Sequence, residues 1–274
     1  MTLIIILVCV GLQRFLGWQR FGCLLPRMAV YFDWMLIKEA AFTKGHALMT
    51  WIWLVLPVLI IVSLIFTLAA YFLGIWSGYL LAAILLWLSL DARDLTKHPY
   101  FDAKAAELFI ITYHRLFAIL FWFAVFAAIG FAPGLLIYGI VLALKNYLQQ
   151  KELLLPVHPN SAPGAAGVAT APISGLLKYT DYVLSWLDWI PLRLVGLTDA
   201  LAGQFSTVFK LWCPYLLKGP SNDLSPLTDW GLAALNLSKQ EAQKQTHEVV
   251  GLLDRVLIIW LAIILLFTLG FLLG

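Results

Sequence analysis

The polar side chains with the most regular spacing lie in residues 179–203, whose sequence is YTDYVLSWLDWIPLRLVGLTDALAG. Asp181, Ser185 and Asp188 recur at positions i, i+4 and i+7, so they line one face of a predicted amphipathic helix. Such side chains can line a binding pocket or take part in a structural ion-pair network, and residue type alone does not separate these roles.

A break in the helix is predicted directly after this polar face. Asp188 is suited to cap a second helix whose first turn contains Pro191, because a proline there has no N–H that needs a partner. Arg193 then shares a face with three small residues, Gly196, Ala200 and Gly203. Another helix can approach such a face closely. The stretch is therefore either an interfacial helix–break–helix with solvated charges or a buried polar joint between membrane helices.

A second group of candidate side chains lies on a helix predicted to begin near Asp102. Glu107, His114 and Arg115 fall on nearly one face of this helix. Arg115 lies about 20 Å from either end of the helix, which is near mid-membrane if the helix crosses upright. Alternatively, residues 102–113 lie in the membrane interface and Arg115 snorkels toward the headgroups.

The buried alternative requires a partner for Arg115. An unpaired arginine at the centre of a membrane helix costs about 2.5–3.5 kcal/mol. We therefore expect Arg115 to point into the helix bundle and to pair with Asp181 or Asp188. Glu107 is a competing partner, but it would leave the two aspartates unexplained.

Other kinds of site have no support in the sequence. There is no P-loop, glycine-rich dinucleotide turn, HExxH or GxSxG motif, and the five histidines have no metal-ligand spacing. The three scattered cysteines are interpreted as apolar packing residues. No catalytic residue, metal or cofactor is predicted. The candidates for binding or for a polar network are Glu107, His114, Arg115, Asp181, Asp188 and Arg193.

The composition predicts that lipid is the solvent for much of the chain. Of 274 residues, 62% are hydrophobic and only 12% are charged, and the mean hydropathy is +0.89. These values lie outside the range of soluble globular proteins. A net charge of +3 is too small to indicate a nucleic-acid partner.

The apolar segments predict an all-α, polytopic membrane protein with about four to six membrane helices. Two hairpins are expected, one within 47–90 and one around the turn at 130–134, and a final span is expected over 256–273. Residues 1–18 either span the membrane or lie in its interface. We predict an N-terminal membrane region at 1–151, a flexible Pro/Ala/Gly linker at 152–175, and a third region at 176–274. This third region combines the helix–break–helix, cytoplasmic helices and the last span.

The distribution of positive charge predicts the orientation in the membrane. The turns at 74–78 and 130–134 contain no lysine or arginine, and all eighteen basic residues fall in segments assigned to the opposite side. The positive-inside rule makes that side the cytoplasm. We expect a multi-pass protein of the inner membrane whose loops are mostly cytoplasmic.

Several motifs resemble those of one superfamily. DYVLSWLDWIPLRL at 181–194 resembles the D…PxRL segment shared by AmpE proteins and the CobD/CbiB cobalamin-synthesis enzymes. YHRLFAILFW at 113–122 is similar to the superfamily's xxAPLFW helix, with Ile119 where proline usually stands. GFAPGLLIY at 130–138 resembles its GGxxGxxxY segment, and residues 222–237 resemble the enzymes' NSPNxG…AAxAGAL region.

The departures from this pattern point to the AmpE branch. The enzymes' GDPxxxPHP-type and acidic ENxxDG motifs are missing, and with them the carboxylates that would hold Mg²⁺ against phosphate. The resemblance implies a non-enzymatic regulatory, signalling or accessory protein of the bacterial inner membrane. It would act in beta-lactamase induction and peptidoglycan recycling, with a cytoplasmic amidase of that pathway as a possible partner. The alternative is a diverged CobD/CbiB-like synthase or a binder of a related small molecule.

Overall fold

The computed structural model describes residues 2–16, 24–39, 47–90, 105–154, 165–238, 240–241 and 245–273. Within these ranges every regular element is helical, so the predicted all-α class is confirmed. The N-terminal half contains α1 (Thr2–Leu16), α2 (Leu24–Glu39), α3 (Ala47–Leu73), α4 (Ile75–Ser89), α5 (Ala105–Thr112), the π-helix η2 (Tyr113–Phe117) and α6 (Ala118–Ala128). The 3-10 turn η3 (Ala132–Gly134) leads into α7 (Leu135–Leu154). The remainder contains α8 (Ala165–Ala202), α9 (Phe205–Leu216), α10 (Ser225–Leu235) and α12 (Thr246–Leu273).

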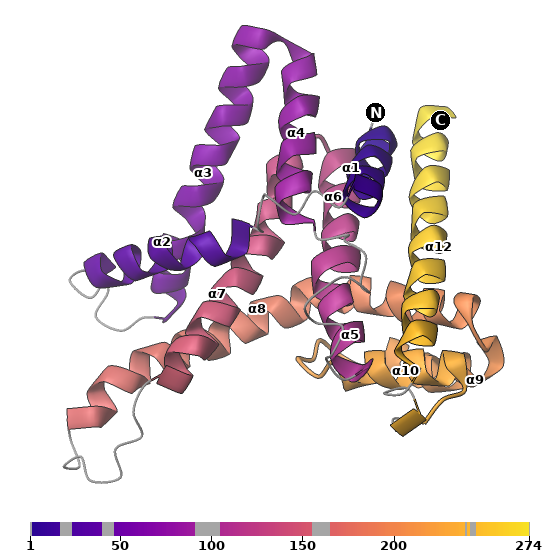
Figure 1. Cartoon of the computed structure of the whole chain (residues 1–274). Coiled ribbons are helices and arrows are strands. Elements are labelled where there is room, and N and C mark those ends of the chain that lie inside the picture. Colours follow the sequence, from indigo (N-terminus) through magenta and orange to yellow (C-terminus); the bar gives the residue numbers. More distant parts are fainter. Residues whose placement is uncertain are drawn as a thin grey trace.

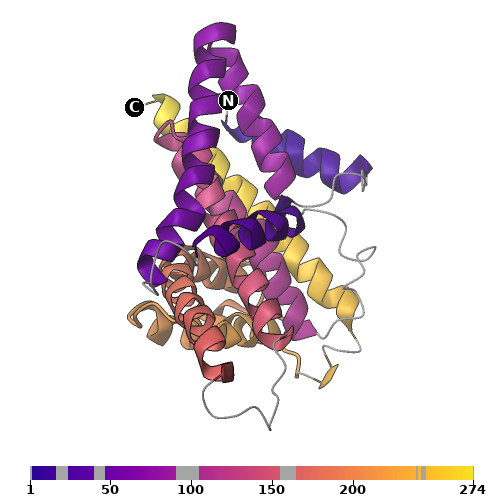
Figure 2. The ribbon, with the colours of Figure 1, turned by 90° about the vertical axis from the view of Figure 1, so that its left-hand side faces the viewer.

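Most of the helices form two differently oriented groups, and α7 runs obliquely between them (Figure 1). The α3–α4 hairpin, the continuous α5–η2–α6 helix and α12 run lengthwise through the molecule. Helices α8, α9 and α10 lie crosswise at the lower end, and we refer to these three as the crosswise layer. The turn of the α3–α4 hairpin and both termini lie toward the opposite end in both views (Figure 2).

Three of the described helices are long and apolar enough to cross a membrane. They cover residues 47–73, 107–128 and 246–270, and shorter apolar helices cover 4–13 and 76–89. Helix α3 exposes a series of large aliphatic side chains, including Leu56, Ile60 and Leu64. Exposing such an apolar surface to water is unfavourable, whereas exposing it to lipid acyl chains is not. The membrane-protein character predicted from composition is therefore confirmed.

Glycines with positive φ angles stand at the two predicted hairpin turns. Gly74 has φ 79° between α3 and α4, and Gly130 has φ 75° between α6 and η3. Side chains with a Cβ atom disfavour this region, so glycine ends each helix at little cost. Both turns therefore lie where the sequence places them.

Helix α8 differs from its prediction in two respects. It continues through Pro191 instead of breaking after Asp188, and it already begins at Ala165, inside the linker expected at 152–175. Helix α7 likewise extends to Leu154, while 155–164 lies outside the described residues. Pro191 removes one backbone hydrogen bond. Buried packing on both sides of it, from Leu184 to Ala200, supplies the compensating stability.

Small residues allow the crosswise layer to pack closely, as predicted. A Cβ atom on Gly196 would collide with the rings of Trp212 on α9 and Trp230 on α10. A Cβ atom on Gly203 would collide with the backbone of Ala234. These glycines let α8 lie directly against its two neighbours, and Ala200 between them is fully buried.

We predict that Gly203→Ala destabilises the protein by about 1–3 kcal/mol, because the obstructing atoms belong to backbone and not to a flexible side chain. The matched control is Gly251→Ala on α12, where a Cβ atom meets no heavy atom within 4 Å. That change should be neutral or slightly stabilising. Unfolding in detergent micelles, followed by circular dichroism, compares the two variants. Equal stabilities of the two variants would contradict the predicted close approach.

Candidate functional site

Asp188 is the centre of a buried polar cluster between the crosswise layer and the lengthwise helices. Its Oδ1 atom accepts hydrogen bonds from the Tyr113 hydroxyl at 2.8 Å and from the Tyr138 hydroxyl at 3.0 Å. The side chain of Asp188 is 4% exposed and both tyrosines are fully buried. Two hydroxyl donors on one carboxylate oxygen offset part of the cost of removing that group from water.

His114 extends this cluster along the lengthwise helix. Its Nδ1 atom lies 2.7 Å from the Tyr138 hydroxyl oxygen. Tyr138 has one O–H and donates it to Asp188, so its oxygen accepts from His114 and the imidazole proton is on Nδ1. The result is a continuous chain of hydrogen bonds from His114 through Tyr138 to Asp188. Such a chain can hold a charge or pass a shift of protons along its length.

The π-helix η2 determines which residues face Asp188. It covers Tyr113–Phe117 and interrupts the α-helical phase between α5 and α6. In this wider turn both Tyr113 and His114 reach the cluster although they are adjacent in sequence, and their ring centroids are 5.1 Å apart. Single π-turns of this kind often occur at functional sites.

The expected pairing of Arg115 with Asp181 or Asp188 is corrected by the structure. Asp181 forms an ion pair with Lys145 of α7, with 3.0 Å between Nζ and Oδ1, and Asp188 is held by tyrosines. Arg115 is partly exposed, and Glu107 is exposed in the first turn of α5. The physical reason is that Lys145 and Tyr138, on one helix, reach both aspartates of α8 from the same side. Of the six predicted residues, His114 and Asp188 lie in the cluster.

Arg193 has a different role from that of the aspartates, because it anchors α9. Its guanidinium donates to the carbonyls of Tyr215, Leu216 and Lys218 at the end of α9. The same group lies over the rings of Trp189 and Tyr215, at 4.4 and 5.4 Å from the centroids. The last carbonyls of a helix lack partners within the helix, and a cation there is favourable. Arg193 thus fixes the orientation of α9 on α8.

Sequence reasoning missed Tyr113, Tyr138 and Asp199. The two tyrosines stand in apolar segments where an aromatic residue is unremarkable. Tyr138 coincides with the tyrosine of the GGxxGxxxY-like segment, but only the three-dimensional contact shows that both tyrosines bind Asp188. Asp199 is 1% exposed, and neither carboxylate oxygen has a hydrogen-bond partner among the described residues. It lies on the face of α8 shared by Gly196 and Gly203, and that shared spacing could have identified it.

The described residues offer no group of three His, Cys, Asp or Glu side chains that could together bind a metal ion.

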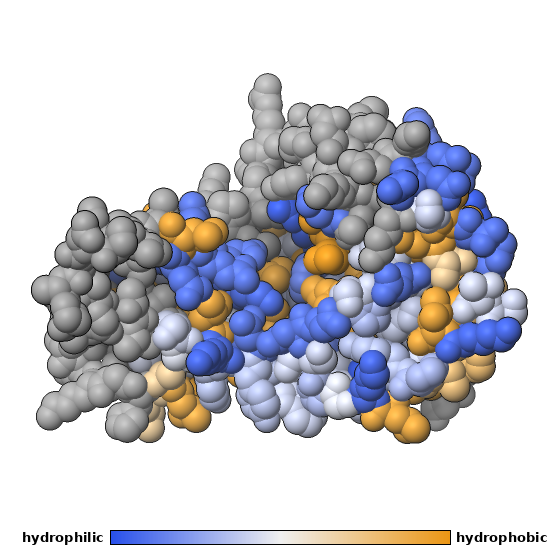
Figure 3. Space-filling model, turned by 90° about the horizontal axis from the view of Figure 1, so that it is seen from below, coloured by the Kyte–Doolittle hydropathy of each residue, from blue (hydrophilic) through white to orange (hydrophobic). Residues whose placement is uncertain are grey.

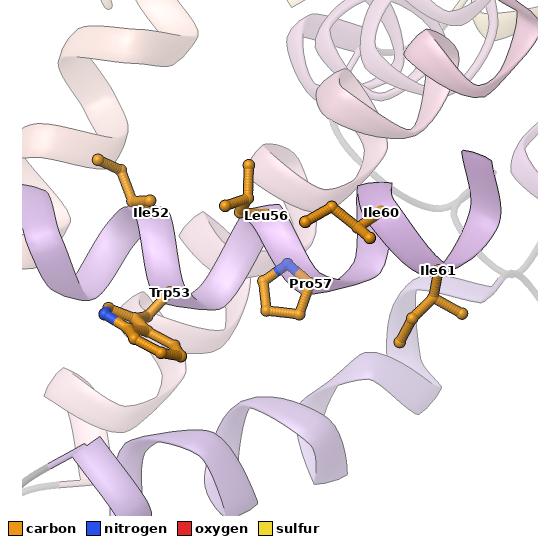
Figure 4. Close-up of a pocket in the computed structure, with 6 residues that line it drawn as sticks. All are labelled: Ile52, Trp53, Leu56, Pro57, Ile60 and Ile61. Atoms are coloured by element: carbon orange, nitrogen blue, oxygen red, sulfur yellow. The ribbon is translucent and has the colours of Figure 1, made fainter. Parts of the chain in front are cut away.

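A pocket on α3 is lined by Ile52, Trp53, Leu56, Pro57, Ile60 and Ile61 (Figure 4). All six come from one helix, and the side-chain atoms drawn are carbon, apart from the indole nitrogen of Trp53 and the ring nitrogen of Pro57. On a spanning helix such a hollow suits an acyl chain and not a polar ligand.

Comparison of the chain with protein-family models, with curated proteins and with solved structures finds no match.

We predict that Tyr138→Phe and Asp188→Asn each destabilise the protein by about 1–3 kcal/mol, because each change leaves buried hydrogen-bonding groups without a partner. The double variant should lose less than the sum of the two, because the groups share one contact. Tyr71→Phe, at a residue 82% exposed, is the matched control and should change stability by less than about 0.5 kcal/mol. Reversible unfolding in mixed micelles provides the free energies. Additive losses would mean that the hydroxyl and the carboxylate act independently.

Proposed function

We propose that this chain is a non-enzymatic regulatory, signalling or accessory protein of the bacterial inner membrane, of the AmpE type. The observation that carries the proposal is the contact between Asp188 of the crosswise layer and Tyr113 of a helix long enough to span the membrane. A rearrangement of the layer moves Asp188 and therefore acts on that helix. The connection also works in reverse, so an event at the membrane can change the surface of the layer.

The motif resemblance supports the specific pathway. The D…PxRL segment contains Asp188 and Arg193, and these two side chains join α8 to the spanning helix and to α9. In this proposal the layer and its loops are cytoplasmic and bind a soluble partner. A cytoplasmic amidase of peptidoglycan recycling suits a role in beta-lactamase induction.

The alternative is a CobD/CbiB-like synthase or a binder of a small molecule. The chain of Asp188, Tyr138 and His114 favours it to a limited extent, because these groups are the kind that hold a polar ligand. They are, however, already bonded to one another, and Asp188 and Tyr138 are buried by the surrounding helices. A ligand would have to displace these bonds, so the regulatory role is the better supported of the two.

The topology is tested with single cysteines at Ser77, Thr96 and Ser161 in a background without Cys9, Cys23 and Cys213. We expect a membrane-impermeant thiol reagent to label Ser77→Cys from outside intact cells. Thr96→Cys and Ser161→Cys should react only after permeabilisation, because the basic segments face the cytoplasm. The turn at 130–134 and the C-terminus should lie on the side of Ser77. Labelling of Thr96→Cys in intact cells would overturn this orientation.

The regulatory role is tested by beta-lactamase induction. In a strain with an inducible enzyme, deletion of the gene for this chain should change nitrocefin hydrolysis after a sub-inhibitory beta-lactam. The wild-type gene and Tyr71→Phe should restore the response, whereas Asp188→Asn should not, because it weakens the link to the spanning helix. Membrane levels of each variant are measured by immunoblot. Unchanged induction in the deletion strain, or rescue of a cobalamin-synthesis mutant, would favour the alternative.

A further inference from the structure

Helix α9 has a second apolar surface that the protein interior does not use. Its inner face, made of Val208, Trp212 and Tyr215, is buried against the rest of the layer. Along the flank of this face, Phe205 and Phe209 stack with 5.2 Å between ring centroids and remain 49% and 37% exposed. Leu201, at the end of α8, is 54% exposed. Adjacent exposed apolar side chains of this kind are a candidate contact site for lipid or protein.

The start of α9 lies at the level where α12 becomes apolar. Arg255 of α12 donates from Nη1 to the carbonyl of Ala202, the last residue of α8, at 3.3 Å. Beyond Arg255 the chain contains no charged residue, and Ile258, one turn further along α12, is 65% exposed. The boundary of the hydrocarbon region on α12 therefore lies within about one helical turn, roughly 5 Å, of this contact.

The charged side chains of α9 and of the residues that end it are basic, and the nearest acidic group, Asp223 in the following loop, interacts with Lys218. Helix α9 contains Lys210 and no acidic residue, and Lys218 is the second residue after its end. Lys210 is exposed, and the ammonium group of Lys218 lies over the Tyr215 ring at 5.3 Å from the centroid. From below, hydrophilic residues cover much of the described surface of the layer, with apolar residues between them (Figure 3).

We propose that α9 is an interfacial helix that binds the anionic phospholipids of the adjacent leaflet. Leu201, Phe205 and Phe209 enter the boundary between headgroups and acyl chains, and Lys210 and Lys218 contact the phosphate groups. Aromatic rings and lysines are the side chains that favour this zone, with an apolar face buried about 5–10 Å into it. The occupant of the flank is thus lipid, and the site selects negatively charged headgroups.

The proposal is tested with an environment-sensitive fluorophore on single cysteines, in full-length protein reconstituted into nanodiscs. Phe209→Cys probes the flank, and Thr207→Cys on the same helix is the control, because two residues turn a helix by about 200°. We expect brominated phosphatidylcholine to quench the probe at 209 strongly, while aqueous iodide quenches the probe at 207. Phe205→Cys should behave as Phe209→Cys does.

Headgroup selectivity is read from the same probe. Exchanging brominated phosphatidylcholine for brominated phosphatidylglycerol should increase the quenching at 209. Lys210→Gln and Lys218→Gln should each reduce this lipid preference by roughly fivefold, the fold-change that corresponds to about 1 kcal/mol per lysine at an anionic surface. Circular dichroism of each variant confirms that the helices are retained.

Three results would overturn the proposal. Equal iodide quenching at 207 and 209 would place the whole of α9 in water. Protection of 209 from both quenchers would mean that protein, such as a second copy of this chain, covers the flank. Quenching at 209 that is the same for both brominated lipids would remove the anionic selectivity.

Discussion

One buried carboxylate must have hydrogen-bond donors because water does not reach it, and this requirement governs how the two parts of the molecule meet. Asp188 of α8 contacts Tyr113 of the lengthwise α5–η2–α6 helix, and it is almost completely buried. An isolated carboxylate would be strongly unfavourable there. Tyr113 and Tyr138 come from different elements to supply its hydrogen bonds. The positions of α5–α6 and α7 relative to α8 are thereby coupled through one oxygen atom.

A second polar anchor repeats this arrangement within the layer. Arg193 binds the carbonyls that end α9, while Trp212 of α9 returns a hydrogen bond to the carbonyl of Arg193 at 2.8 Å. Asp188 and Arg193 are five residues apart on α8, so one helix carries both the contact to the membrane part and the contact to α9. The apolar core fills the space around these two anchors, and the polar contacts fix the positions of the helices relative to one another.

A structural feature can be predicted from the sequence when the residues that cause it lie close together in the chain. Composition reports the solvent, so the helical membrane class was predictable, and glycines at 74 and 130 report turns because only they adopt positive φ cheaply. The partners of Asp188 were not predictable, because tyrosines 25 positions apart in sequence meet only after the helices are packed. Pro191 misled the prediction, since tertiary packing outweighed a local helix-breaking preference.

The π-helix η2 also changes the direction in which side chains point along the continuous α5–η2–α6 helix. A wider turn inserts extra rotation, so the face of α5 before residue 113 is offset from the face of α6 after residue 117. Phe109 before the turn lies against Gly231 of α10, whereas Phe121 after it contacts Trp260 of α12. The wider turn therefore joins two helical segments whose side-chain faces point in different directions. One continuous helix can therefore pack against both α10 and α12, although the two contacts require different side-chain directions. Deletion of a single residue within 113–117 would restore ordinary α-helical spacing, and only one of the two contacts could then be kept.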